Sequence, residues 1–234
     1  LTMAIRILPF RDYDEHDVVN IYRMDGVKGD FIDLSETTKR STNAGDAGVF
    51  VKVKNGQLGG GQLGGWDPVD IETNAASLLG KTDYPHVGRN VYPQASLTVE
   101  PVAGSGEACL GITLRQTVEK DENGENLLYN PVKKDELFGV LPGEAVPVLS
   151  KGLVSITDAA VNGTLSVGES LITSTNGKVS GVAYGTASDA IGMVIGNGAR
   201  EDAIHGSGNI GATNVFGGYG YQSGAYYLVK LNCA

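Results

Sequence analysis

A glycine-rich stretch near the end of the chain contains the most suggestive chemical motif. Residues 206–211 read GSGNIG, which has the spacing G-x-G-x-x-G of dinucleotide-binding turns. In such a site the motif joins a strand to a helix, because the pyrophosphate binds at the helix N-terminus. The residues that follow, TNVFGGYGYQSG, cannot form that helix because glycine recurs through them. We therefore predict no nucleotide site and no cofactor.

Carboxylates gather in two short runs, DYDEHD at 12–17 and EKDENGE at 119–125. Neither run supplies both the glycine and the terminal bidentate glutamate of an EF-hand calcium loop. The three histidines, His16, His86 and His205, lie far apart and have no His or Cys neighbour at the spacing of metal ligands. We predict that both runs are solvated acidic segments and that the chain holds no metal.

An enzyme is the alternative from a different functional class. A glycan hydrolase of the cell envelope would use a pair of carboxylates, here drawn from 12–17 or 119–125. Acidic residues in loops without an aromatic cleft seldom form such a site. The sequence also contains no nucleophile elbow, P-loop or H-E-x-x-H motif. We predict that the protein is not an enzyme and has no catalytic residues.

The charge of the chain argues against nucleic acid as a partner. The 234 residues include 18 Lys and Arg against 27 Asp and Glu, which gives a formal net charge of −9. A phosphate-binding surface needs clustered cations, and the basic residues here form short groups such as Lys133 and Lys134. We therefore predict no nucleic-acid partner.

Membrane association and disulfide bonding are not expected either. The longest weakly charged stretch, 203–228, contains seven glycines, unlike a membrane-spanning helix, and no signal peptide is recognisable. The two cysteines, Cys109 and Cys233, are too few for a disulfide framework, so we expect reduced thiols. These features favour assembly in the cytoplasm.

Short β-strands punctuated by glycine dominate the second half of the chain. Apolar residues recur there at the spacing of side chains that share one face of a strand. Asn176-Gly177 lies between two such runs and predicts a type I′ hairpin turn, in which both central residues have positive φ. The residues predicted to share faces are Val154 with Ile156, Val167 with Leu171, Ile191 with Met193 and Ile195, and Tyr227 with Val229 and Leu231. A small antiparallel barrel or sandwich is expected.

The first half of the chain is less regular. Residues 1–35 mix apolar pairs with charges and show no helical period, so we expect an extended arm that reaches outward and contains one or two strands. A half-buried strand is predicted at 48–56, and a flexible Gly-rich loop at 56–65 contains GQLGG twice. The segment 67–80 has the cap, the apolar face and the terminal glycine of one short helix.

Together these patterns predict an all-β protein with one short helix. We expect an extended, β-rich N-terminal region at 1–95 and a β-domain at 96–234 that folds without the arm. A Gly- and Tyr-rich insertion at 196–225 separates two strongly patterned strands. Its aromatic residues, among them Tyr219 and Tyr221, either pack on the domain or contact a partner.

The strand series resembles the capsid decoration, or cement, proteins of tailed bacteriophages. The elements that carry the resemblance are Val146–Leu149, Lys151–Leu153, Val167–Leu171, Asn176–Val179, Ile191–Val194 and Val229–Leu231. In that family these elements belong to a small antiparallel β-barrel or β-tulip domain, which the resemblance implies for the C-terminal part of this chain. The first 95 residues and the insertion before the last strand have no counterpart in the family pattern.

The resemblance implies a structural virion protein that binds the outer surface of an assembled capsid and stabilises contacts between major capsid subunits. It further implies a homo-oligomer, with a trimer favoured, assembled in the host cytoplasm. An arm that adds a strand to a neighbour's sheet would make the contact, and its apolar candidates are Ile5, Ile7, Phe10, Val18, Val19 and Ile21. The alternative is a phage tail, fibre or host-surface component that contacts a glycan or receptor through Tyr219 and Tyr221.

Overall fold

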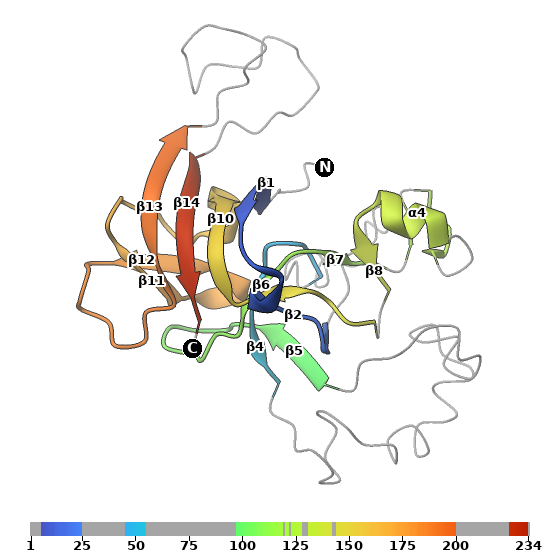
Figure 1. Ribbon diagram of the computed structural model, residues 1–234, viewed down its shortest axis with the longest axis horizontal. Helices are drawn as coiled ribbons and strands as arrows, with labels where there is room; N and C mark the ends of the chain where they lie inside the picture. Colours follow the sequence, from blue (N-terminus) through green and yellow to red (C-terminus); the bar gives the residue numbers. More distant parts are fainter. Residues whose placement is uncertain are drawn as a thin grey trace, which may run out of the picture.

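The computed structural model describes residues 6–24, 45–54 and 97–233, apart from 119, 122, 128–130, 142–143 and 200–224. Several sequence predictions lie outside the described residues, namely the loop at 56–65, the helix at 67–80, most of the insertion at 196–225, and the contact candidates Ile5, Tyr219 and Tyr221. The described part consists mainly of β-strands, as the sequence predicts, and most of them form two six-stranded sheets (Figure 1).

Sheet A has the strand order β1-β10-β14-β13-β11-β12 and is antiparallel throughout. Its strands are β1 (Ile7–Asp12), β10 (Lys151–Thr157), β11 (Ser170–Thr173), β12 (Val179–Val182), β13 (Gly192–Ala199) and β14 (Ala225–Asn232). The pairing of β10 with β14 runs without a break from Lys151 opposite Asn232 to Thr157 opposite Tyr226. The last strand of the chain is therefore central in this sheet, between β10 and β13 (Figure 1).

Period two in the sequence gives the correct buried faces for β10 and β14, where all five residues predicted to share a face are buried, namely Val154, Ile156, Tyr227, Val229 and Leu231. The predicted pairing of Val167 with Leu171 is wrong, because Val167 is 56% exposed and Leu171 is fully buried. The prediction for β13 is wrong, because Val194 is fully buried and Ile195 is 36% exposed. The register of β13 against β14 shifts between Val194 and Gly196. Such a bulge changes the alternation of faces within a strand.

The turn at Asn176-Gly177 confirms the predicted hairpin. β11 and β12 pair from Ser170 opposite Val182 to Thr173 opposite Val179. Asn176 has a φ of 58° and Gly177 a φ of 65°, and the Lys178 amide donates a 3.2 Å hydrogen bond to the Thr175 carbonyl. Both central residues thus have the left-handed conformation that a type I′ turn requires.

Sheet B has the order β2-β9-β6-β4-β5-β3. Its strands are β2 (Val18–Val19), β3 (Tyr22–Met24), β4 (Phe50–Val53), β5 (Leu97–Pro101), β6 (Gly111–Thr113) and β9 (Val148–Leu149). Every pairing is antiparallel except that of β3 with β5. The strand predicted at 48–56 is β4, and its first residues, Phe50 and Val51, are fully buried.

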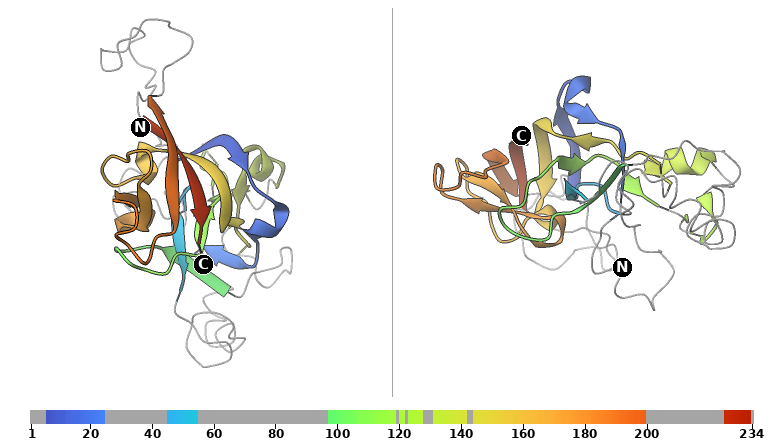
Figure 2. Two further views of the ribbon diagram at one scale, coloured as in Figure 1. Left: turned by 60° about the vertical axis from the view of Figure 1, so that its left-hand side comes forward. Right: turned by 90° about the horizontal axis from the view of Figure 1, so that it is seen from below.

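A small unit lies to one side of the sheets (Figure 2). It combines a two-stranded parallel sheet, β7 (Gln116–Thr117) and β8 (Gly139–Val140), with the helix α4 (Pro131–Glu136), which the sequence did not predict. A separate hydrophobic cluster of Val118, Leu127 and Leu141 supports it. Besides the turn at η5 (Thr175–Gly177), the described residues contain the 3-10 helices η1 (Glu15–Asp17) and η4 (Asp158–Ala160).

The two sheets share one hydrophobic core. The largest buried cluster contains Phe50, Ile112 and Leu149 from sheet B together with residues of β10, β11, β13 and β14 from sheet A. Each sheet also takes strands from both sides of residue 95. The predicted division into 1–95 and 96–234 therefore does not coincide with a boundary between sheets. The order of strands in both sheets is linear, and the predicted barrel remains a prediction.

The expectation that residues 1–35 form an arm reaching outward is wrong for residues 7–24. Their strands pair within the chain, β1 with β10, β2 with β9 and β3 with β5. Ile7 and Val18 pack against the main cluster and Met24 is buried in a second one. Burying these apolar side chains and pairing the backbone both favour the docked conformation over an extended one.

Candidate partner-binding surface

Residues 7–24, here called the edge segment, form three of the four outer strands of the two six-stranded sheets. β1 is the first strand of sheet A, and β2 and β3 are the two outer strands of sheet B. Edge strands carry backbone N–H and C=O groups that can pair with another chain. The segment that the sequence singled out for partner contact is therefore placed where an added strand could bind, although it is docked rather than extended.

The middle of β1 bulges away from its neighbour. Its pairing with β10 changes register between Ile7, opposite Ile156, and Arg11, opposite Val154. Pro9 lies within this bulge, where its missing N–H removes no regular ladder hydrogen bond. Phe10 follows and is 59% exposed. A bulge at a sheet edge limits uncontrolled strand pairing and re-aims a side chain, and here an aromatic ring is presented to the surroundings.

The acidic run at 12–17 forms the turn that joins β1 to β2. Asp14 caps the 3-10 helix η1 by accepting a 3.0 Å hydrogen bond from the His16 amide, and the Asp17 side chain accepts from the Asp14 amide. The Asp17 carbonyl then accepts from both the amide (2.9 Å) and the hydroxyl (2.8 Å) of Ser150. The first carboxylate run thus serves a capped turn that fixes the edge segment to β9 and β10.

The structure divides the predicted contact residues into two groups. Ile7 and Val18 are half-buried and pack against the main hydrophobic cluster, and Val19 is also half-buried. Phe10 and Ile21 are 59% and 54% exposed. Fewer residues than the sequence suggested are therefore available for a partner, and the strongest candidates on the edge segment are Phe10 and Ile21.

A buried arginine that sequence reasoning missed holds the start of the edge segment. Arg6 is 3% exposed, and its Nη1 donates to the carbonyls of Asn176 (3.4 Å) and Gly177 (3.3 Å) at the hairpin tip. Burial lowers the pKa of the guanidinium, and the charge of Asp46 opposes that effect. Nothing in the local sequence pattern marks Arg6, because its partners lie far away along the chain.

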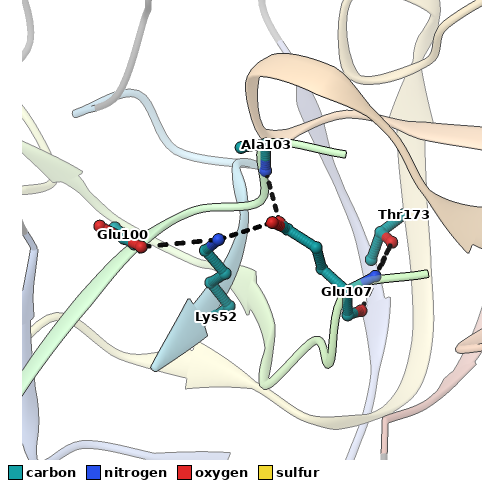
Figure 3. A network of polar contacts seen from close by, with 5 residues as sticks. All are labelled: Lys52, Glu100, Ala103, Glu107 and Thr173. Carbon is teal, nitrogen blue, oxygen red and sulfur yellow. Dashed lines mark hydrogen bonds and ion pairs between the residues drawn. The ribbon is translucent and has the colours of Figure 1, made fainter. Parts of the chain in front are cut away.

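A polar network ties sheet A to sheet B (Figure 3). Lys52 on β4 forms ion pairs with Glu107 at 2.7 Å and with Glu100 at 3.6 Å. The other Glu107 oxygen accepts a 2.6 Å hydrogen bond from the Ala103 amide, and the Glu107 amide donates to the Thr173 hydroxyl at 3.0 Å. Thr173 ends β11, so this loop glutamate fastens one sheet to the other.

The electrostatics of this network suit anchoring rather than acid–base catalysis. The hydrogen bond from Lys52, followed by that from Ala103, lowers the pKa of Glu107, and the hydrogen bond to Glu107 raises the pKa of Lys52. Each group therefore stays charged over a wider pH range. A general acid or base needs a pKa near the working pH. The two shifts instead move the pKa of Glu107 further below neutral pH and the pKa of Lys52 further above it.

The prediction that the second carboxylate run, at 119–125, is a solvated segment is wrong for Asp121, which is a buried structural carboxylate. Asp121 is 4% exposed, and its Oδ1 accepts hydrogen bonds from the amides of Asn123 (2.9 Å) and Glu125 (2.8 Å). It stabilises the turn at Gly124, whose φ is 82°. The envelope-enzyme alternative would draw its pair of carboxylates from these two runs, in which Asp14, Asp17 and Asp121 each accept backbone hydrogen bonds within a turn.

Within the described ranges no group of three or more His, Cys, Asp or Glu residues is placed to hold a metal ion. Among the helices of the same residues, none has the length and apolar character needed to cross a membrane. No protein-family model matches the chain, and neither a curated protein nor a solved structure matches it.

Proposed function

We propose that this chain is a structural virion protein that binds the outer surface of a phage capsid and stabilises contacts between major capsid subunits. The proposal rests on the likeness of the strand series to capsid decoration proteins. The observation that carries it further is the edge segment, which occupies three outer strands of two sheets and exposes Phe10 and Ile21.

Strand addition to the edge segment would use β1 and β2, because β3 already pairs with the 145–146 segment through the bridge from Arg23 to Ala145 and the hydrogen bond from the Val146 amide to the Tyr22 carbonyl. A flat capsid surface offers no deep pocket, and main-chain hydrogen bonds along a sheet edge give affinity without one. The apolar side chains beside the edge supply further binding free energy, because burying a large apolar side chain contributes roughly 1.5–3 kcal/mol. Phe10 and Ile21 are about half exposed already, so each contributes roughly 1 kcal/mol per copy on burial.

Such modest contacts become strong on a repeating lattice. A homo-oligomer, for which we favour a trimer, would engage several capsid subunits at once, and linked contacts gain effective concentration. We further propose that sheet B approaches the small barrel typical of decoration proteins. In support, its outer strands β2 and β3 are consecutive in the chain, and a bridge joins Arg23 of β3 to Ala145.

A rebinding experiment tests the contact surface. Virions are stripped of this protein and incubated with purified wild type or with the double variant Phe10→Ser/Ile21→Ser. The variant should be folded by circular dichroism and should lose at least tenfold in affinity for the stripped particles, because about 2 kcal/mol of apolar burial is removed. Tyr184→Ser is the matched control, since Tyr184 is 77% exposed and lies outside the edge segment.

The outcome distinguishes the contact surface from the function. Equal rebinding by wild type and the double variant would remove the edge segment as the anchor while leaving capsid binding intact. A density map of intact particles tests the function itself. Density for the protein on the head supports decoration, and density on the tail or fibres would replace decoration with a host-binding role.

Stabilisation of the shell is tested by heating. A protein that binds only the assembled lattice stabilises it by mass action. Particles that lack the protein should therefore release DNA at a lower temperature than intact particles, and adding the protein back should restore the original release temperature. Identical release profiles from particles verified to differ in occupancy would refute the stabilising role.

A further inference from the structure

The two cysteines are far apart in the sequence and lie together in the fold. Cys109, which precedes β6, is buried in the main hydrophobic cluster, and Cys233, which follows β14, packs against the same cluster. Cys109 lies close enough to Cys233 to raise the pKa of its thiol, and the Cys233 Sγ donates to the Ile191 carbonyl at 3.9 Å. Both residues are free thiols in this structure.

Backbone contacts hold the two segments that contain Cys109 and Cys233 close together. The Cys233 amide donates a 3.0 Å hydrogen bond to the carbonyl of Ser150. The preceding residue of that segment, Leu149, lies so close to Gly111 that a Cβ at position 111 would overlap its carbonyl oxygen. Cys109 Sγ in turn donates to the Gly111 carbonyl at 3.6 Å. Ser150 is therefore bonded to Cys233, and the adjacent Leu149 contacts Gly111, two residues after Cys109.

We propose that Cys109 and Cys233 are a dithiol that closes to a reversible intramolecular disulfide under oxidising conditions. The bond would fasten the end of β14, a central strand of sheet A, to the loop that leads into β6 of sheet B. The protein would then exist in a reduced form and in a stapled, oxidised form. This inference is independent of the capsid role, because it depends only on the geometry within one chain.

Hydrogen peroxide is the oxidant we consider. The Cys233 thiolate, from the more exposed of the two residues, attacks one peroxide oxygen, the O–O bond breaks, and a sulfenic acid and one water form once a proton is taken up. The Cys109 sulfur then attacks the Cys233 sulfur, the S–S bond forms, the S–O bond breaks, and the hydroxyl leaves as water with the Cys109 proton. Two thiols lose two electrons in total, and one peroxide is reduced to two waters.

The surroundings of Cys233 make this oxidation slow at neutral pH. The interaction with Cys109, and then burial, raise the pKa of the Cys233 thiol above its usual range. Because the thiolate is the nucleophile, the rate of closure should rise by about tenfold for each pH unit above neutral pH. A disulfide that forms this slowly is suited to lasting stabilisation of the fold rather than to rapid redox cycling.

Mass spectrometry of the full chain tests the proposal. Purified reduced protein is treated with hydrogen peroxide at pH 8 and digested without reduction. We expect a monomer lighter by about 2 Da, the mass of two hydrogen atoms lost in disulfide formation. The digest should contain one linked peptide pair, Cys109 with Cys233. The melting temperature should rise by about 5 to 15 °C, because the bond closes a long loop, and a reducing agent should reverse the rise.

Two variants separate the staple from general oxidation. Cys233→Ser and Cys109→Ala should show neither the linked peptides nor the rise in melting temperature after the same treatment. If Cys109→Ala folds poorly, the linked peptides from the wild-type digest still test the proposal. Each of three outcomes would overturn the proposal. These are disulfide-linked dimers, oxidation of Cys233 to sulfinic acid while Cys109 stays a free thiol, and recovery of both thiols unreacted after the treatment. A disulfide that leaves the melting temperature unchanged would overturn the stapling effect.

Discussion

Gly177→Val tests the central turn and its docking in a single substitution. Gly177 is buried, has a φ of 65°, and lies at the tip of the β11–β12 hairpin. Its amide donates a 2.8 Å hydrogen bond to the Val102 carbonyl. A Cβ at this position would overlap a side-chain methyl of Val49 and would lie 3.3 Å from Cβ of Pro101. The turn therefore needs glycine both for its conformation and for its contact with sheet B.

The expected cost has two parts. A β-branched residue held at positive φ costs about 1 to 3 kcal/mol. Forcing its side chain against the buried Val49 adds about 1 to 3 kcal/mol of overpacking. The free energy of unfolding should therefore fall by about 2 to 6 kcal/mol, which lowers the melting temperature by about 5 to 20 °C in a protein of this size.

Thermal unfolding followed by circular dichroism measures the effect, and Gly185→Val is the matched control. Gly185 has a φ of 80°, and a Cβ at this position would meet no atom within 4 Å beyond its chain neighbours. That variant should suffer only the conformational part, about 1 to 3 kcal/mol. Equal losses in both variants would refute docking of the hairpin tip on β4 and β5. An unchanged melting temperature in Gly177→Val would refute the turn conformation as well.

Three further predictions concern the anchoring contacts. Arg6→Leu should lower the free energy of unfolding by about 1 to 3 kcal/mol in urea denaturation, because the buried Gly177 carbonyl and the partly buried Asn176 carbonyl lose a charged donor, and an unchanged value would show that the contact is dispensable. Glu107→Gln should cost up to about 1 kcal/mol at pH 7, since the carboxylate is 28% exposed. Because its folded pKa is lowered, that contribution is present above about pH 4.3, its unfolded value, and is lost as pH falls through the folded pKa. The difference between wild type and Glu107→Gln should thus shrink in melts below about pH 4, and a constant difference would contradict the ion pair. A chain that begins at residue 25 should lose cooperative unfolding, because Ile7 and Val18 leave the core, and a melting temperature equal to that of the full chain would support the predicted independent folding of the β-domain.

Patterns within a few residues predicted the local structure well. Val154 with Ile156, and Tyr227 with Val229 and Leu231, were assigned to buried faces because alternation is fixed by strand geometry alone. The positive φ at Asn176 and Gly177 followed for a similar reason, since these residue types favour the left-handed region that the turn requires. The exception within a strand is β13, where a bulge changed the exposed face.

The candidate site was predicted in part. The sequence pointed to the first residues of the chain and to their apolar side chains as the contact surface. It could not separate Phe10 and Ile21, which are exposed, from Ile7 and Val18, which pack on the core. That separation depends on a bulge in β1 and on the partner strand β10, whose residues come more than a hundred positions later.

The sequence by itself determined that this is a β-rich chain with short strands, a glycine turn at 176–177 and acidic segments without a metal-binding motif. Tertiary structure decided which strands are neighbours, and it docked the N-terminal segment as sheet edges. It also buried Arg6 against the hairpin tip and brought Cys109 to Cys233. The physical reason is that alternation and turn propensity act between neighbouring residues, whereas pairing, burial and thiol contact depend on distant segments that meet only in the folded core.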